Sequence, residues 1–535
     1  MRGPLYYGLL ALVPTALAAA IVWHALLGGG RVGADCASAG RLPCIRPDYV
    51  ECVIPPNIAS LNFRIQEPGV RYVARIYGTR GRTIEVASGT GRVVMPLRAW
   101  SALLHENRGA ELYFDIYVKA RKGRWSRYAT VTNKVAAENI DGYLAYRLID
   151  GVYNIWGDMG IYQRTLESYD ESLVLANTSF GNGCVNCHTF WNNRPDKMVI
   201  QIRHGPEDYG SGMVLIDHGV VKKVDTRTPV SPTFSAYVSW HPSGRLAAFS
   251  MNKVRQFFHT ARGEVRDVCD LDSDLAVYVA DSGSVISTPA ISRSDRLETY
   301  PTWSPDGRYL YYCSAPILWS DRDKLPPEHY DQVRYDLMRI SCDTETRTWG
   351  EPETVLSGQE TGKSITLPRI SPDGRWLLFC MSDYGCFPIH QASADLYMMD
   401  LTTRQYKRLG INSDRTESWH SWSSNSRWLV FSSKRLDGLQ ARPYFSYVDA
   451  EGETHKPFLL PQGDPDFYDG FLRTYNLPEL IGDPIRVRGE GIAGVIRSGR
   501  WEKVEAAVTS ASPRSDTKAS TAPSGEAEEP WQPGY

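Results

Sequence analysis

Apolar and polar positions alternate with a period of two along most of the chain, which predicts β-strands. Between residues 57 and 135 the alternation runs through short segments such as YVARIYG and ELYFDIYVKA, with Gly, Pro and Asn at the turns. Roughly six or seven strands in about 80 residues are typical of a small β-sandwich of the immunoglobulin or fibronectin type. We therefore expect a β-sandwich domain over residues 57–138.

From residue 143 onward the chain repeats one turn, and each copy leads into an apolar strand. Four copies are clear: WHPSGR at 240–245, WSPDGR at 303–308, ISPDGR at 370–375 and WSSNSR at 422–427. They lie 63, 67 and 52 residues apart. Self-similarity at this spacing predicts a β-propeller with one copy in each blade.

Two weaker repeats, at 143–177 and 184–227, precede these four, so we expect six blades. The first weaker repeat offers only three strands and lacks an inner one. We expect a segment after the last blade, FYDGFLRTYN at 467–476, to supply that strand and to close the ring. Closure removes the exposed edge that an open sheet would leave.

The repeated turn resembles the W-S-P-D-G-[RK] turn of the TolB-type propeller family, over roughly residues 143–476. The resemblance implies an all-β protein whose residues 139–480 form a TolB-like six-bladed propeller. In that family the blade motif specifies architecture rather than activity. TolB-type blades also occur in prolyl peptidases, but no G-x-S-x-G elbow and no hydrolase domain are found in this sequence.

The N-terminal segment is almost continuously apolar from Leu5 to Leu27, and Arg2 is the only charge before it. Such a stretch is long enough to span a bilayer as a helix. Ala16-Leu17-Ala18, however, resembles a signal-peptide cleavage site. We therefore expect residues 1–30 to be either a signal-anchor or a cleaved signal peptide. Both place the rest of the chain on the periplasmic side of the inner membrane.

Two further segments lie outside the expected domains. Residues 31–56 contain Cys36, Cys44 and Cys52 and are expected to be a linker. Residues 481–535 are expected to be a C-terminal extension that is disordered from about residue 505, because Ala, Ser, Thr, Pro and Glu dominate there. In an exported protein, the eight cysteines outside the motif described next could form disulfides, whose pairing the sequence does not give.

The sequence Cys184-Val185-Asn186-Cys187-His188 is the C-x-x-C-H motif that attaches haem c. The two thiols would form thioethers with the haem vinyl groups, and His188 would bind the iron as the proximal ligand. The alternative is a redox-active dithiol, but the chain lacks the βαβ pattern expected around one. The motif lies where the second blade should have its inner strand and turn. We therefore expect one covalent haem c built into the propeller.

The distal ligand of the iron has three candidates. If the haem motif occupies the turn of the second blade, His241 lies at the neighbouring turn of the third blade and could reach the iron. Met198 and Met213 are the rivals, and either would give His/Met ligation with a higher potential. Both methionines also border predicted core strands, where Met more often serves packing.

Charge and composition reduce the number of functions that fit this sequence. The formal net charge is -2, without long runs of one sign, so no nucleic-acid partner is expected. We expect a monohaem c-type cytochrome, an electron carrier serving a membrane respiratory or photosynthetic complex. One alternative is an accessory subunit that docks on a membrane complex and holds a structural or sensory haem. The other is a haem oxidoreductase such as a peroxidase.

Overall fold

The structure is a computed structural model that describes residues 32, 36–121, 123–150, 157–260 and 266–506. The described chain falls into two compact units. The first comprises residues up to 137 together with 461–469, and the second comprises 138–460 and the residues from 470 onward. The expected signal or anchor segment, Leu5 to Leu27, lies outside the described residues. Among the residues that are described, no helix is long and apolar enough to cross a membrane.

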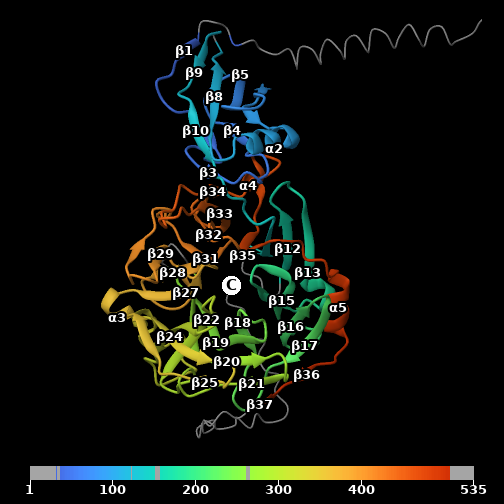
Figure 1. Cartoon of the computed structure of the whole chain (residues 1–535), viewed down its shortest axis with the longest axis vertical. Coiled ribbons are helices and arrows are strands. Elements are labelled where there is room, and N and C mark those ends of the chain that lie inside the picture. The colour runs from blue at the N-terminus through green and yellow to red at the C-terminus, as the bar shows by residue number, and fades with distance from the viewer. Residues whose placement is uncertain (1–31, 33–35, 122, 151–156, 261–265, 507–535) are drawn as a thin grey trace, which may run out of the picture. The chain divides into compact units, whose positions relative to one another are not determined.

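The described part of the first unit contains two sheets and the helix α2 (Figure 1). The larger sheet consists of β1 (Cys36–Ser38), β3 (Val53–Ile54), β5 (Arg71–Gly78), β6 (Ile84–Ser88), β8 (Glu111–Lys119), β9 (Trp125–Arg127) and β10 (Val131–Val135). The smaller sheet consists of β2 (Ile45–Arg46), β4 (Phe63–Ile65) and β7 (Arg92–Val93). The expected linker thus contributes β1, β2 and β3, which are too short to show a period-two pattern. The helix α2 (Leu97–Glu106), which strand alternation did not predict, buries Trp100 against Phe114.

The second unit contains six sheets of four or five strands. The first sheet is β35 (Thr474–Ile481), β11 (Tyr143–Ile149), β12 (Gly160–Thr165) and β13 (Glu171–Ala176). The second is β14 (Cys184–Trp191), β15 (Arg194–Arg203), β16 (Gly212–Asp217), β17 (Val220–Asp225) and β36 (Glu502–Lys503). The third is β18 (Ser235–Trp240), β19 (Leu246–Phe258), β20 (Arg266–Val279), β21 (Ser284–Ile286) and β37 (Glu505–Ala506).

The remaining three sheets follow in chain order. The fourth is β22 (Arg296–Trp303), β23 (Tyr309–Pro316), β24 (Asp336–Asp343), β25 (Thr348–Trp349) and β26 (Glu353–Leu356). The fifth is β27 (Ser364–Ile370), β28 (Trp376–Ser382), β29 (Asp395–Asp400) and β30 (Tyr406–Arg408), preceded by the short helix α3 (Gly358–Thr361). The sixth is β31 (Glu417–Trp422), β32 (Trp428–Ser433), β33 (Arg442–Tyr447) and β34 (Phe458–Leu459).

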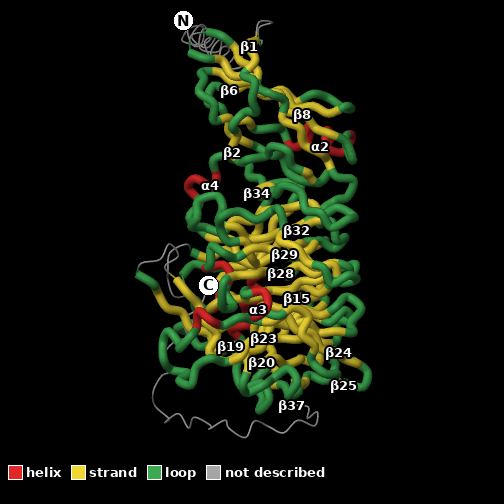
Figure 2. Tube along the Cα trace, turned by 90° about the vertical axis from the view of Figure 1, so that its left-hand side faces the viewer, coloured by secondary structure: helices red, strands yellow, loops and turns green. Residues whose placement is uncertain are grey.

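The six sheets surround a common centre, so the second unit is a β-propeller (Figure 1). Its regular structure consists mainly of strands, with few helices among the described residues (Figure 2). The repeated turn joins the inner two strands in the third to sixth sheets. In each copy the backbone closes the turn in the same way, as where Ser371 N–H donates to Trp376 O and Gly374 N–H donates to Ser371 O, both at 2.8 Å. Gly374 has a φ of +77°, which glycine adopts without strain.

A strand from after the last blade closes the propeller, as the sequence predicts, but it lies later than expected. β35 is residues 474–481 rather than 467–476, and it pairs antiparallel with β11 as the inner strand of the first sheet. Residues 467–470 form the short helix α4 (Phe467–Gly470) instead. Residues 461–469, which include most of α4, belong to the first unit, where Asp466 pairs with Arg64.

The C-terminal extension forms regular structure over residues 489–506, and the rest of the segment that we expect to be disordered lies outside the described residues. The helix α5 (Gly489–Arg497) buries Ile492, Ala493 and Ile496 in the apolar cluster between the first and second sheets. After it, β36 adds in parallel to β17, and β37 adds in parallel to β21. The extension therefore covers the outer edges of two neighbouring blades, which is one way in which proteins protect sheet edges.

Candidate functional site

A ring of β-bulges lines the centre of the propeller. In five inner strands the ladder skips two residues, and the first of each pair has a positive φ: Tyr237 (+48°), Tyr300 (+53°), Leu367 (+55°), Trp419 (+46°) and Leu477 (+49°). Bulky residues rarely adopt this conformation, because the Cβ crowds the backbone. All five side chains line one central chamber. The bulges therefore turn one residue per blade toward the axis.

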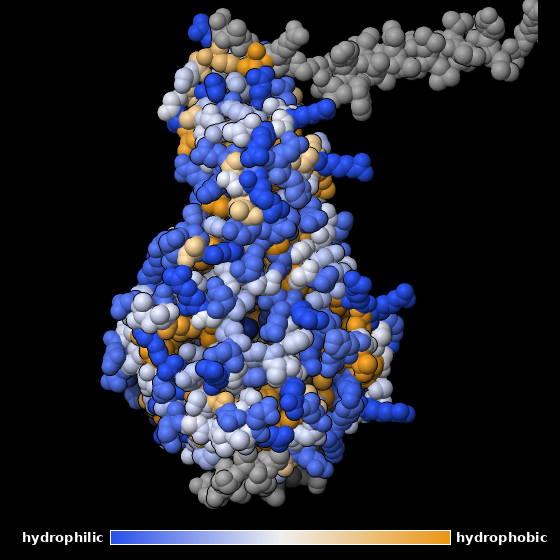
Figure 3. All heavy atoms as spheres, in the orientation of Figure 1, coloured by the Kyte–Doolittle hydropathy of each residue, from blue (hydrophilic) through white to orange (hydrophobic). Residues whose placement is uncertain are grey.

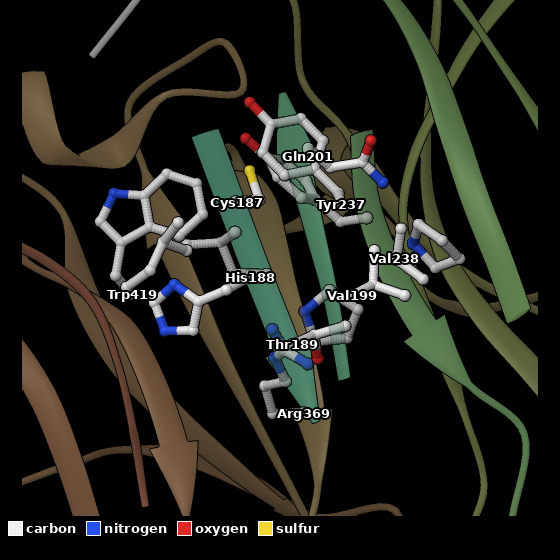
Figure 4. A pocket seen from close by; sticks show the side chains of 14 residues that line it. Cys187, His188, Thr189, Val199, Gln201, Tyr237, Val238, Arg369 and Trp419 are labelled. Atoms are coloured by element: carbon white, nitrogen blue, oxygen red, sulfur yellow. The ribbon is translucent and has the colours of Figure 1, made fainter. Parts of the chain in front are cut away.

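The C-x-x-C-H motif fills the sixth place in this ring. It forms the first half of β14, and the ladder with β15 skips Asn186 and Cys187, between Val185 and His188. Cys187 and His188 line the same chamber as the five bulge residues (Figure 4). The motif thus occupies the inner strand rather than the turn of the second sheet, where Asn192 and Asn193 stand instead.

The two motif cysteines face different surroundings. Cys187 belongs to the apolar cluster around the chamber, which includes Tyr300 and Trp419. Cys184 is 1% exposed and packs between the first and second sheets. Neither cysteine is in a disulfide. Burial raises the pKa of both thiols, and Arg147 partly opposes that rise. In this strand conformation only one of the two thiols faces the chamber.

His188 is buried and has no hydrogen-bond partner. It is 3% exposed, and neither ring nitrogen makes a hydrogen bond among the described residues. The edge of its ring meets Phe190, with the ring centroids 5.7 Å apart. Burial, helped by Arg147 and Arg369, lowers the pKa of His188 to about 3, and the Ala145 backbone offsets this only in part. The imidazole is therefore neutral at physiological pH, which is the form that binds a metal.

Arg147 fixes the motif from the neighbouring sheet. Its Nη1 donates to the Val185 carbonyl oxygen at 3.2 Å and to Asn186 Oδ1 at 2.9 Å. Its Nη2 donates to Asn476 Oδ1 at 2.9 Å. Since Arg147 lies on β11 and Asn476 lies on β35, one buried side chain ties the motif to the strand that closes the propeller.

A wider hollow, which we call the mouth, lies next to the chamber. The chamber leaves about 30 Å³ for the centres of water-sized molecules, room for roughly two waters. The mouth offers about 330 Å³ and is walled by Trp240, Trp303 and Trp422 of the repeated turns. Thr189 and Arg369 line both spaces and so form the neck. On the face turned to the viewer, a hollow lies near the centre of the propeller (Figure 3).

The three candidate distal ligands lie elsewhere. His241 accepts the Ser243 backbone N–H at Nδ1, at 3.1 Å, and its Nε2 lies 3.1 Å from the carbonyl oxygen of Gly307 in the next turn. Met198 lies between the first and second sheets and Met213 between the second and third, and both are fully buried. None of the three lines the chamber. The expectation for His241 placed the motif at the turn, and the turn begins three residues beyond His188.

Sequence reasoning missed three residues near the chamber. Arg369 carries the charge at the neck, and Glu479 lines the mouth at 8% exposure. His420, on β31 next to Trp419, is 3% exposed and has no hydrogen-bond partner at either nitrogen among the described residues. Burial and Arg369 lower its pKa to about 3. Arg369 lies one residue before the repeated turn at 370–375, and His420 lies two residues before the one at 422–427, so their place in the repeat is the signal that could have found them.

Replacing His420 with leucine is expected to remove part of the acid sensitivity of the fold. Below about pH 6.5 the unfolded chain protonates this histidine, whereas the folded chain does so only near pH 3. The free energy of unfolding of the wild type should therefore fall relative to His420→Leu as the pH drops from about 6.5 to about 3, by up to about 1.4 kcal/mol per pH unit. Urea unfolding at several pH values measures the difference. A difference that stays constant with pH would contradict the burial of a neutral imidazole.

Comparison with known proteins gives similar structures only. No family model matches the chain, and no curated protein matches it. The propeller of Dos1 is 14% identical, with 45% of this chain and 66% of that chain covered and a TM-score of 0.27. Hydrazine synthase of Kuenenia stuttgartiensis is 12% identical, with coverages of 50% and 64% and a TM-score of 0.28. This chain thus covers less than two thirds of both.

A third similar structure is the propeller domain of the Trilobed protease from Pyrococcus furiosus. It is 11% identical, with 60% of this chain and 95% of that chain covered and a TM-score of 0.32. Within the part of the chain that the structure describes, no group of three or more His, Cys, Asp or Glu residues is arranged to hold a metal ion. His188, with its free nitrogens beside Cys187, is therefore the feature on which a functional assignment depends.

Proposed function

We propose that this chain is a monohaem c-type cytochrome that transfers electrons outside the cytoplasmic membrane. Cys184 and Cys187 would carry the haem, and His188 would bind its iron. The partner would be a membrane respiratory or photosynthetic complex. On this proposal the six sheets are the blades of a TolB-like propeller, and the first unit is an immunoglobulin- or fibronectin-like domain. The observation that supports it best is the buried, neutral His188, unpartnered within a C-x-x-C-H sequence.

The residues present offer the thiols and the imidazole that a haem c needs, but the chamber has room for only about two waters, so it must widen and β14 must change to hold the group. When bound, the haem supplies an iron that cycles between two oxidation states. His188 offers a neutral nitrogen, and Cys187 offers a thiol in the same chamber. Cys184 faces the core between two sheets, so attachment requires β14 to rearrange between Cys184 and Cys187. Arg147 would hold the Val185 carbonyl and the Asn186 side chain during that change.

Optical spectra of the purified protein test the proposal. The reduced pyridine adduct should absorb as haem c, and acid-acetone should fail to extract the pigment. An electron carrier should keep both axial positions occupied, so carbon monoxide should leave the reduced spectrum unchanged. A purified protein without pigment, from cells that attach haem to other cytochromes, would refute the assignment.

A haem oxidoreductase is the second candidate, and the mouth favours it. An opening of about 330 Å³ that narrows toward His188 would admit a small molecule, which a simple electron carrier does not need. A catalytic or gas-binding iron keeps an open position. Binding of carbon monoxide to the reduced protein would therefore favour this second candidate over electron transfer.

The location proposed for the protein is the periplasmic side of the inner membrane. If the segment from Leu5 to Leu27 stays attached as an anchor, the protein should resist carbonate extraction, and deletion of residues 1–30 should release it. A mature N-terminus near Ala19 would instead indicate a cleaved signal peptide. Membrane fractionation with N-terminal sequencing distinguishes the two outcomes.

A further inference from the structure

Arg369 occupies the neck of the central channel with most of its hydrogen-bonding capacity unused. It follows the bulge of β27 and lines both the chamber and the mouth (Figure 4). Its guanidinium makes no hydrogen bond among the described residues. The nearest carboxylate atom is Glu479 Oε1, 3.6 Å from Arg369 Nη2, an ion-pair contact rather than a hydrogen bond. A guanidinium has five donors in a fork that matches an oxyanion.

Two further arginines lie close to the motif that faces the chamber. Arg147 lies close enough to His188 to lower its pKa, as Arg369 does. Arg203 lies close to Cys184 and Cys187. Among the described residues that line the chamber and the mouth, Arg369 is the one cationic side chain and Glu479 the one carboxylate. Arg147 and Arg203 lie behind the lining, and their charges add to the attraction of an anion to the chamber.

Glu479 itself is poorly paired. It is 8% exposed, and its Oε1 has no hydrogen-bond partner among the described residues. Burial raises its pKa to about 7, so near neutral pH a good part of its charge is lost. The Phe190 backbone and the Thr189 side chain support this carboxyl, but an Oε1 atom left without a hydrogen bond is costly, which makes Glu479 a weak counter-ion for Arg369. A better-placed oxyanion would displace it.

We infer that Arg369 binds a carboxylate or a small inorganic oxyanion at the neck of the channel. The anion would lie against the guanidinium where the Glu479 carboxylate now approaches it. The mouth, walled by three tryptophans, gives access from solvent. The same chemistry has two sources: a free anion that enters through the mouth, or a propionate of the haem that we propose for this chamber. Only the second source depends on the proposed function.

Anion titration of three variants tests the inference. The variants are Arg369→Gln, Glu479→Gln and the control Arg375→Gln, an exposed arginine of the same blade whose guanidinium donates to the Ala450 carbonyl oxygen. Calorimetry at low ionic strength uses formate and inorganic phosphate as probes. Arg369→Gln should weaken formate binding roughly tenfold or more. Glu479→Gln should strengthen it, and Arg375→Gln should leave it unchanged.

Titration with and without haem separates the two sources, with Cys184→Ala/Cys187→Ala as the haem-free protein. If a free anion is the natural occupant, formate binds both forms. If a propionate is the occupant, formate binds only the haem-free form, and Arg369→Gln changes the midpoint potential of the haem form. The inference is overturned if formate and phosphate bind neither form and Arg369→Gln leaves the potential unchanged. The titration of the haem-free protein does not depend on the cofactor. A protein that proves to carry no haem can therefore still show or lack the anion site at Arg369.

Discussion

Changing Cys184 and Cys187 together to alanine is expected to give a folded protein without covalent haem. The thioethers require both sulfur atoms, so the variant should lose the haem c absorbance and the haem stain on a denaturing gel. Both cysteines are buried, and burial keeps them as neutral thiols in the haem-free chain. Their loss should cost only about 1 kcal/mol each in packing, since a single sulfur atom is removed from each site.

A matched control uses cysteines in other blades. Cys313 on β23 and Cys380 on β28 are as deeply buried as the motif cysteines, at 0% exposure. The variant Cys313→Ala/Cys380→Ala therefore removes the same number of buried sulfur atoms but should keep its haem. Normal covalent haem in the Cys184/Cys187 variant would refute the attachment site. Loss of haem in both double variants would instead point to a folding defect.

The repeated turns made most of the propeller predictable. Each copy has polar residues that close a tight turn between two apolar strands, and this local chemistry can be read without knowing the fold. The four clear copies all lie where β18–β19, β22–β23, β27–β28 and β31–β32 join. In the first unit several strands are short and the helix α2 interrupts them. Alternation alone therefore predicted β-structure there, but not the short strands β1, β2 and β3 or the helix.

The closing strand was expected at 467–476, but it lies at 474–481. β35 contains Pro478, but the proline lies in the bulge, where no ladder hydrogen bond is required of it. In β35 the bulge is Leu477-Pro478. Two other bulges also consist of an apolar or aromatic residue followed by proline, at Tyr300-Pro301 and Leu367-Pro368. This repeated pair is visible in the sequence and would have placed the closing strand correctly.

The position of the haem motif could be predicted only to the level of the blade. The sequence showed that residues 184–188 replace an inner strand or its turn. It could not show that Asn186 and Cys187 form the bulge of that strand, because register depends on pairing with β15. The distal ligand expected at His241 depended on that register. Arg369 and Glu479 come together at the neck from β27 and β35, which are 110 residues apart in the sequence, so no local pattern links them.

Ending the chain after Arg473 is expected to abolish cooperative folding of the propeller. The truncation removes β35 and with it Tyr475, Leu477, Leu480 and Ile481, which are at most 6% exposed. Burying one such side chain contributes roughly 1.5–3 kcal/mol. Four of them contribute roughly 6–12 kcal/mol, which is comparable with the whole stability of a typical protein. The truncated chain would also leave the inner edge of β11 without its partner.

A chain that ends after Gly482 is the matched control, because it keeps β35 and loses α5, β36 and β37. It should unfold cooperatively in urea, with a midpoint lowered by the loss of Ile492 and Ile496 from the core. The chain ending at Arg473 should show no sharp transition and should bind a dye that reports exposed apolar surface. If both chains unfold at similar urea concentrations, β35 does not close the propeller. That result would also contradict the structure of the channel described above, because β35 supplies Glu479 to the mouth and Asn476 to Arg147.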